Sequence, residues 1–361
     1  MNPVLANIAQ RFASNQKILQ IKPLGNGLIN DTYWVQTQGD DFVLQKINAH
    51  VFPFPEKTLD NLLQLQHHLK NLPDWAIRLK LPEILQTTEQ QYSLRDGENN
   101  VWRALEFISP SESRETLSNP TEAAQIGKAL GHFHSLFSDL DTGLLFDTLP
   151  GFHVTPSYFQ AYLDASAQSL AVVEDDDCHR CQDFIRQHQT RINILESASQ
   201  QGLLKTRVIH GDPKLNNFLF ACDSDVIISL IDLDTVKPGL IHYDIADCLR
   251  SCCHIPDNNR FDMQLAEVIL RHYILEAGKM MTEADYDYLY DAIWLIPFEL
   301  GLRFFTDYLQ GNRYFKISEP RENLKRAIAQ FELCSDIEQQ KPKLFNMVEQ
   351  LKSCSTAIKT A

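Results

Sequence analysis

The sequence lacks the long apolar runs and the excess of positive charge that mark two large classes of protein. No stretch has enough consecutive apolar residues to cross a bilayer, and residues 1–15 lack the apolar centre of a signal peptide. Lysine and arginine number 33 against 47 aspartate and glutamate, a formal net charge of -14. That charge repels phosphate backbones and anionic lipid. The sequence therefore predicts a cytoplasmic protein with no nucleic-acid and no membrane partner.

The eight cysteines lack the regular pairing of a small secreted disulfide protein. Cys178 and Cys181 form one C-x-x-C, but no second pair at zinc spacing accompanies them. The cysteines are therefore predicted to be reduced thiols with a structural role.

Apolar residues make up 44% of the chain and charged residues 22%, enough for a large core or two adjoining ones. Alternating β-prone runs predict strands at residues 32–37, 42–47, 81–86, 91–95 and 101–107, with helices at 3–14 and 56–71. Beyond residue 115 the periodicity predicts helices over 121–137, 156–167, 183–199, 262–276, 285–308 and 321–351. A β-loop-hairpin segment interrupts them at 206–234. We therefore predict an α+β protein with a small antiparallel-sheet lobe, 1–108, and a larger, mainly helical lobe, 109–361.

The segment from His210 to Asp232 has the residue types that phosphoryl transfer requires: a group that aligns the acceptor hydroxyl, metal ligands and a cation. Asp212, at the tip of the loop, can orient the hydroxyl and accept its proton. Asn217 and Asp232 can supply oxygen ligands to a metal ion, and Lys214 can touch the transferring phosphate. His210 is predicted to hold the loop rather than to catalyse. An Asx-rich surface loop is the non-functional alternative.

The pattern H-x-D-x-x-x-x-N followed by I-D-x-D resembles the aminoglycoside phosphotransferase and choline kinase superfamily, distant relatives of protein kinases. The resemblance implies a protein-kinase-like two-lobed fold with a nucleotide-binding N lobe and a catalytic, substrate-binding C lobe. It implies ATP as co-substrate and Mg²⁺ as cofactor. Asp212 would be the catalytic base, with Asn217 and Asp232 as the metal ligands. Asp244 and Asp247 are expected to cap and brace a helix behind the site.

The resemblance also implies a nucleotide site built mainly from the N lobe. A strand-turn-strand would cover the phosphates, a strand lysine would bind them, and the chain crossing between the lobes would bind adenine through its backbone. The residues concerned are Gly25, Asn26, Gly27, Lys46, Glu106 and Ile108, together with Lys214 of the loop. An exposed strand lysine is the alternative interpretation of Lys46, and its glutamate partner is not identified.

Three stretches resemble the N-acetylhexosamine 1-kinases: 25–33 with 43–48, then 230–239, and 302–309 with 314–316. This implies transfer of the γ-phosphate of ATP to the anomeric hydroxyl of an amino sugar, N-acetylglucosamine or N-acetylgalactosamine. Arg303 and Tyr314 would hold the sugar together with Asp212, and Asp31 would reach it from the small lobe. Forked donors and flat aromatic walls suit a sugar, and Asp307 is a further candidate. Alternatively, Arg303 braces the helical core through a carboxylate.

Other acceptors and other classes of function stay open. Aromatic residues at 298, 304, 305, 308, 314 and 315 suit choline or a related amino alcohol, because a quaternary amine needs an aromatic cage with acids. An aminoglycoside-type acceptor is a further alternative. A pseudokinase that binds nucleotide without turnover and a pure interaction module are the non-enzymatic hypotheses, although all three residues of the catalytic pattern are present.

Overall fold

A computed structural model gives the structure of the protein and describes residues 3–25, 29–168 and 175–359. The chain forms two compact units. Unit 1 consists of Met1–Arg114, Asp139–Pro150 and Asn217–Pro238, and unit 2 consists of Glu115–Ser138, Gly151–Asn216 and Gly239–Ala361. The lobe boundary at residue 108 stays a prediction.

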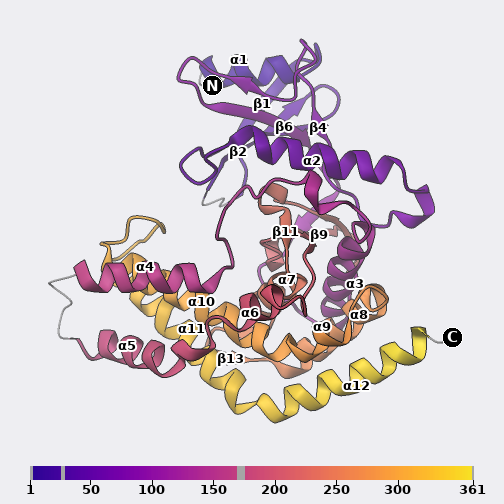
Figure 1. The fold of residues 1–361 in the computed structure, drawn as a ribbon. Helices are drawn as coiled ribbons and strands as arrows, with labels where there is room; N and C mark the ends of the chain where they lie inside the picture. Colours follow the sequence, from indigo (N-terminus) through magenta and orange to yellow (C-terminus); the bar gives the residue numbers. More distant parts are fainter. Residues whose placement is uncertain (1–2, 26–28, 169–174, 360–361) are drawn as a thin grey trace. The chain divides into compact units, whose positions relative to one another are not determined.

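Unit 1 is built on a six-stranded antiparallel sheet (Figure 1). Its strands run in the order β1-β2-β3-β6-β4, and β5 also pairs with β6. They are β1 (Ile18–Pro23), β2 (Asp31–Thr37), β3 (Phe42–Lys46), β4 (Ile84–Leu85), β5 (Leu94–Arg95) and β6 (Val101–Glu106). The helical elements of unit 1 are α1 (Pro3–Phe12), α2 (Pro55–Lys70), η1 (Asp74–Ala76), η2 (Thr142–Leu144) and η5 (Leu233–Thr235).

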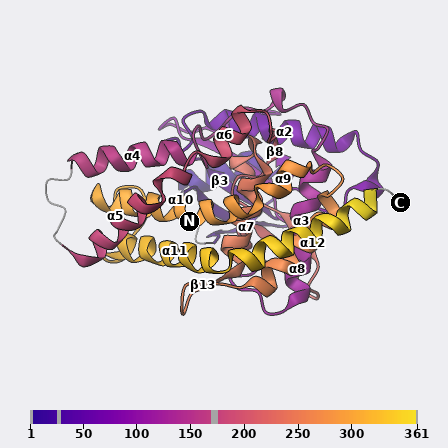
Figure 2. The same cartoon turned by 60° about the horizontal axis from the view of Figure 1, so that its bottom comes forward.

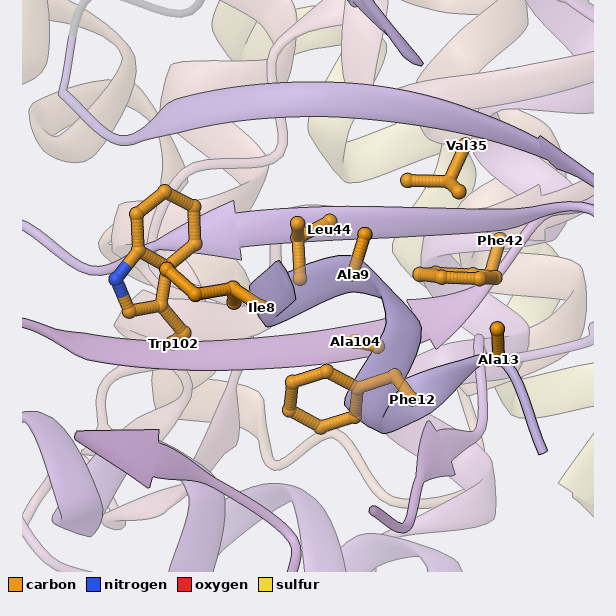
Figure 3. Packing of buried hydrophobic residues seen from close by; sticks show 9 residues of the cluster. All are labelled: Ile8, Ala9, Phe12, Ala13, Val35, Phe42, Leu44, Trp102 and Ala104. Atoms are coloured by element: carbon orange, nitrogen blue, oxygen red, sulfur yellow. The ribbon is translucent and has the colours of Figure 1, made fainter. Parts of the chain in front are cut away.

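Helix α1 covers one face of this sheet (Figure 3). Side chains alternate along a strand, so every second residue of β3 and β6 points to α1. The buried cluster that results contains Ile8, Ala9, Phe12, Ala13, Val35, Phe42, Leu44, Trp102 and Ala104. The intervening residues, Gln45 and Arg103 among them, point to the opposite face, where the Arg103 guanidinium lies 3.5 Å from Thr58 Oγ1 on α2. The two faces of the sheet are therefore lined by different chemistry, apolar under α1 and polar under α2.

A second, three-stranded sheet in unit 1 carries the distant segment 217–238. Its order is β10-β9-β7, formed by β7 (Ser111–Ser113), β9 (Phe218–Ala221) and β10 (Ile227–Leu230). The backbone N–H of Lys80 donates to the carbonyl oxygen of Ile228 at 2.9 Å and so joins this sheet to the segment before β4. The strand β11 (Lys237–Gly239) contains the boundary between the last segment of unit 1 and unit 2.

Unit 2 is mainly helical. Its elements are α3 (Pro120–Leu136), α4 (Thr155–Gln168), α5 (Asp176–His188), η3 (Gln189–Arg191), α6 (Ile194–Gln200), β8 (Arg207–Ile209), η4 (Leu215–Asn217, whose last residue belongs to unit 1), α7 (Ile241–Cys253), β12 (His254–Ile255), β13 (Arg260–Phe261), α8 (Met263–Ala277), α9 (Glu283–Asp287), α10 (Leu289–Leu309), α11 (Glu322–Gln339) and α12 (Lys341–Lys359). Helix α10 packs on α11 and on α7, and α3 packs on α8 (Figure 2).

Glycines on α3 allow α8 to approach closely. A Cβ on Gly131 would lie 2.7 Å from the carbonyl oxygen of Tyr273, a separation that real Cβ atoms do not adopt. Gly127 faces the backbone of α8 one turn earlier. Close contact between the two helices fixes the side chains that they send toward α7.

The predicted α+β fold, with a small antiparallel sheet and a larger helical part, is confirmed. Several predicted boundaries are wrong. The single helices expected over 183–199, 285–308 and 321–351 are each divided, and α7, which contains Asp244 and Asp247, was predicted without bounds. Pro342 is the second residue of α12, a position that tolerates a missing N–H, whereas a helix interior does not. Thr282 and Asp285 form a capping box that begins the separate helix α9.

Two further expectations concern cysteine and hydropathy. Cys178 and Cys181 are both buried on α5, and the described cysteines are free thiols. Among the residues that the structure describes, no helix combines the length and the apolar character needed to span a membrane.

Candidate active site

The loop that carries Asp212 is held by Asp244 of α7. The carboxylate of Asp244 accepts hydrogen bonds from the backbone N–H groups of His210 at 2.7 Å and Gly211 at 2.8 Å. Gly211 has a φ of +88°, a left-handed conformation that glycine adopts without strain. The bracing role expected for Asp244 is therefore directed at the loop itself, because its oxygens bind loop N–H groups rather than the end of a helix.

Asp244 has a further partner in His134. The His134 Nε2 atom lies 2.9 Å from Asp244 Oδ2, and its Nδ1 atom lies 2.8 Å from the hydroxyl of Tyr273. A carboxylate only accepts, so Nε2 donates to Asp244. Burial raises the pKa of Tyr273, which keeps its hydroxyl neutral and able to donate to Nδ1. The chain of contacts ties the loop to α3 and α8.

His210 holds the loop from within. Its side chain is fully buried and packs edge-on against Phe133, with ring centroids 5.8 Å apart. Its Nδ1 atom accepts a hydrogen bond from the backbone N–H of Asp212 at 3.2 Å. These contacts agree with the holding role expected for His210.

The side chain of Asp212 contacts Lys214, whose Nζ lies 2.7 Å from Asp212 Oδ2. Both side chains are only partly buried, at 24% exposure for Asp212 and 38% for Lys214. The two residues proposed from the sequence for proton transfer and phosphate contact are therefore adjacent.

His153 is a second support of the loop that the sequence did not reveal. It is buried, and its Nε2 donates to the carbonyl oxygen of Gly211 at 2.7 Å. Its Nδ1 lies 3.3 Å from Glu299 Oε1. Burial acts to lower the pKa of His153, but the charges of Glu299 and Asp247 and the bond to Gly211 outweigh it, so the pKa lies above its ordinary value. The signal that was available is Glu299, a lone acid in an apolar helical run, which indicates a buried and paired charge.

Arg303 lies one turn after Glu299 on α10, surrounded by aromatic rings. Its guanidinium carbon is 5.2 Å from the ring centroid of Phe152, 5.0 Å from that of Tyr158 and 5.6 Å from that of Phe315. Burial acts to lower the pKa of Arg303, but its neighbours outweigh burial and the pKa lies above its ordinary value. Those neighbours are Tyr158, Glu299, Tyr314 and Asp212. The structure thus brings Arg303, Tyr314 and Asp212 into one region of unit 2.

Asp307, considered from the sequence as a sugar contact, has its oxygens bound by the protein. Its Oδ1 accepts from the backbone N–H groups of Arg313 and Tyr314, both at 2.8 Å, and its Oδ2 from that of Phe315 at 2.9 Å. Asn323 also donates to Oδ2 at 2.9 Å. Asp307 therefore shapes the loop that carries Tyr314, whose side chain is exposed.

The backbone segments that carry the two candidate metal ligands lie at one end of the β9–β10 hairpin in unit 1. Phe218 pairs with Leu230, and the carbonyl oxygen of Asn217 accepts from the N–H of Ile231 at 2.9 Å. Asp232 follows directly. An amide oxygen and a carboxylate are ligands that Mg²⁺ accepts, usually together with phosphate and water oxygens. The donor set therefore fits a magnesium ion shared with a nucleotide.

Residues of the predicted nucleotide turn are described only in part. Gly25 has a φ of +68°, and the N–H of Leu24 donates to the carbonyl oxygen of Thr32 at 2.9 Å, which closes the turn. Asn26 and Gly27 lie outside the described residues. The role of the turn stays a prediction.

Lys46 pairs with Asp31 across β2 and β3, with Nζ 2.6 Å from Oδ2. The hydrogen bond that Lys46 donates to Asp31 is the largest influence on the pKa of Lys46 and raises it. Asp31 and Lys46 lie two residues along their strands from Tyr33 and Leu44, so their side chains are on the same face of the sheet, the face covered by α1. Lys46 thus lies on the face opposite Arg103. The phosphate role of Lys46 and the sugar role of Asp31 stay predictions. Glu56, at the start of α2, pairs with Arg95.

Glu106 and Ile108 lie where β6 ends. The backbone N–H of Glu106 donates to the carbonyl oxygen of Glu83 at 2.8 Å, and the Glu106 carboxylate pairs with Lys80. Ile108 is buried, and its carbonyl oxygen accepts from Ser111 Oγ at 2.6 Å. Adenine binding by this segment stays a prediction.

We predict a pH-dependent loss of stability from Glu196. Burial raises the pKa of its carboxyl from 4.5 to about 7, and the Tyr243 hydroxyl donates to it at 2.9 Å. Between these two values the native protein binds more protons than the unfolded chain, so the contribution of Glu196 becomes more unfavourable as pH rises and is constant above about 7. Glu196→Gln should therefore stabilise the protein by about 2 kcal/mol more at pH 8 than at pH 5.5.

Denaturant unfolding of both proteins at the two pH values measures this difference. Parallel pH profiles for the wild type and Glu196→Gln would show that the carboxyl titrates normally in the native state.

A small antiparallel sheet and a mainly helical unit, together with the family that the sequence matches, define a small-molecule phosphotransferase of the kinase-like type. Residues 20–280 match the model of the phosphotransferase enzyme family, and the chain belongs to that family.

Solved structures of similar fold span nearly the whole chain. An aminoglycoside phosphotransferase from Alicyclobacillus acidocaldarius is 16% identical, with a TM-score of 0.66 and 96% of each chain covered. A microcompartment-associated aminopropanol kinase is 16% identical, with a TM-score of 0.63 and coverage of 94% of this chain and 98% of that one. A choline kinase from Cryptosporidium parvum is 14% identical, with a TM-score of 0.61 and coverage of 97% and 99%. At these identities the likeness shows the shared fold.

Proposed function

We propose that the protein transfers the γ-phosphate of ATP, with Mg²⁺, to the anomeric hydroxyl of an N-acetylhexosamine. The observation that carries the choice of acceptor is the position of Arg303, whose guanidinium lies among three aromatic rings in the region of Asp212. The family supports the coarser statement, a kinase with an alcohol group as acceptor.

In this proposal Asp212 orients the acceptor hydroxyl and accepts its proton. The anomeric hydroxyl is the most acidic of a sugar, which lightens the demand on the base. Lys214, 2.7 Å from Asp212, adds positive charge where the transferring phosphate gains negative charge. Asn217 and Asp232 would hold the Mg²⁺, which supplies charge neutralisation at the phosphates.

The surroundings of Arg303 favour a neutral acceptor over a cationic one. Recognition of a quaternary amine needs aromatic faces that are available to the ligand cation. Here the rings of Phe152, Tyr158 and Phe315 already face a guanidinium, which repels a second cation. Phe298 and Phe305, two further rings considered for a cage, are fully buried in the core of unit 2. A hexose instead uses the planar donors of an arginine and the flat wall of a ring.

Phosphorylation of a panel of acceptors tests the proposal. ADP release with ATP and Mg²⁺ is measured with N-acetylglucosamine, N-acetylgalactosamine, glucose, choline, aminopropanol and kanamycin. We expect the highest kcat/KM with an N-acetylhexosamine and phosphate on its anomeric carbon by chemical shift. A higher kcat/KM with choline or aminopropanol would overturn the sugar assignment, and no acceptor-dependent ADP release from any compound would favour a nucleotide-binding protein without turnover.

Arg303→Met should weaken acceptor binding more than it slows the chemistry. The methionine keeps an apolar stem against the rings but removes the donors. The KM for the N-acetylhexosamine should rise about ten- to a hundredfold, equivalent to roughly 1.4–2.7 kcal/mol, with little change in the KM for ATP.

Arg326→Met is the matched control. Arg326 also stacks on a ring, with its guanidinium carbon 5.6 Å from the centroid of Phe304, but it pairs with Glu322 on the same helix. An equal rise in KM in both variants would mean that Arg303 only braces the fold.

A further inference from the structure

The second aspartate of the I-D-x-D pattern, Asp234, is buried in an ion pair inside unit 1. Its Oδ1 lies 2.5 Å from Nη2 of Arg103, and its Oδ2 accepts a hydrogen bond from the Asn30 side chain at 2.7 Å. The side chains of Arg103 and Asp234 are 1% and 2% exposed. A carboxylate enclosed in this way has its charge neutralised by the protein and does not face a metal ion.

Arg103 distributes its remaining donors over the polar face of the sheet. Its Nε and Nη2 donate to Gln45 Oε1 at 3.0 and 2.8 Å, and Thr58 Oγ1 on α2 lies 3.5 Å from Nη1. A buried charge without partners costs several kcal/mol, so the cation and the carboxylate require each other. Through Arg103, Asp234 is connected to β3, β6 and α2.

Asn30 connects the same carboxylate to the end of the predicted nucleotide turn. While its Nδ2 donates to Asp234, its Oδ1 accepts from the backbone N–H of Asn48 at 2.9 Å. Asn30 is 9% exposed, and both ends of its amide are used. The residue that follows the turn is therefore fixed to the segment that contains Asp232.

Asp232 has a strained backbone conformation that contacts of its neighbouring residues must stabilise. Its φ of +63° and ψ of +53° are left-handed, a conformation that costs a non-glycine residue on the order of 1–2 kcal/mol. On one side Ile231 is bonded to Asn217, and on the other, two residues later, Asp234 is bound by Arg103 and Asn30. Release of Asp234 would free one side of the strained residue.

We propose that Arg103, Asp234 and Asn30 form a positioning triad that orients Asp232 toward the metal and fixes its segment to Asn30. Asp234 is a positioning residue in this scheme and not a metal ligand. The inference rests on the proposed function, because it takes Asp232 as the ligand of the nucleotide-bound metal.

Metal binding to the full-length protein tests the triad without reliance on turnover. Mn²⁺, which reports its own binding by electron paramagnetic resonance, is titrated into the protein saturated with ADP. ADP binding in EDTA and the thermal midpoint are measured in parallel. The variants are Asp234→Asn, which keeps the shape but removes the charge, and Asn30→Ala, which leaves the Arg103 ion pair in place if the first variant does not fold. Asp285→Asn is the matched control, since it breaks a buried pair with Arg207 in unit 2.

We expect the Kd of Mn²⁺ to rise on the order of ten- to a hundredfold in Asp234→Asn and less in Asn30→Ala, as for other residues that orient metal ligands. The Kd of ADP in EDTA should change less than about threefold. Asp285→Asn should lower the thermal midpoint but leave Mn²⁺ binding unchanged. A normal Kd of Mn²⁺ in both triad variants, whatever their thermal midpoints, would overturn the proposal and leave the triad a purely structural element. Absence of ADP-dependent Mn²⁺ binding in the wild type would instead overturn the proposed function on which it rests.

Discussion

Asp212→Asn is expected to lower kcat about 10³-fold, within the range that a positioned general base contributes. The amide keeps the size of the side chain but neither accepts the proton of the acceptor hydroxyl nor attracts Lys214. Because the loop backbone is held by Asp244, His153 and His210, the substitution should leave the fold and the KM for ATP nearly unchanged. Acceptor-dependent ADP release measures kcat.

The matched control for this variant is Asp223→Asn, the same chemical change in the exposed turn between β9 and β10. It should retain full activity. A kcat for Asp212→Asn within threefold of the wild type would remove Asp212 as the base and with it the proposed chemistry.

Asp244→Asn should reduce both stability and turnover. The buried carboxylate accepts from two backbone N–H groups of the loop and contacts His134. The side-chain NH2 group of an asparagine at this position would face one of these N–H donors, and no hydrogen bond could form there. We expect the free energy of unfolding to fall by about 3 kcal/mol, as when one partner of a buried charged hydrogen bond is removed. Displacement of the loop should lower kcat by roughly a hundredfold. Denaturant unfolding and steady-state kinetics measure the two effects.

Asp285→Asn is the control that separates the effect of Asp244→Asn on stability from its effect on kcat. Asp285 is a buried carboxylate of unit 2 that accepts from Arg207 and from the backbone of Thr282. Its loss should destabilise the protein to a similar extent with kcat unchanged. If both variants lowered kcat equally, the effect of Asp244 on turnover would be a general result of instability.

Patterns that are local in the chain were predictable from the sequence. Asp212, Asn217 and Lys214 lie within one loop, and the hairpin between Asn217 and Asp232 follows from two β-prone runs around a polar turn. The structure confirms that hairpin, and its register brings the segments of Asn217 and Asp232 to the same end. The order of a small sheet followed by helices was also predictable, because hydrophobic periodicity depends on local structure.

Partners that are distant in the chain were not predictable. Arg103 stands in an apolar strand where a long cation is ordinarily exposed, and its partner Asp234 lies 131 residues away. His153 gives no local pattern at all, because its role depends on Glu299 of α10. Asp307 shows the converse error, since its position suggested a ligand contact while loop N–H groups occupy its oxygens. Lys46 has the residue type expected of a phosphate-binding strand lysine, but only the register of β2 and β3 reveals which face of the sheet its side chain occupies.

The dependence of the N-terminal sheet on residues 217–238 has a consequence for biosynthesis. A nascent chain that has emerged only as far as residue 114 contains all six strands of the main sheet but lacks Asp234. Arg103 then has no carboxylate to neutralise it in the interior, and burying it alone is costly. We therefore expect Arg103 to become buried in the sheet only after Asp234, nearly two thirds of the way along the polypeptide, has left the ribosome.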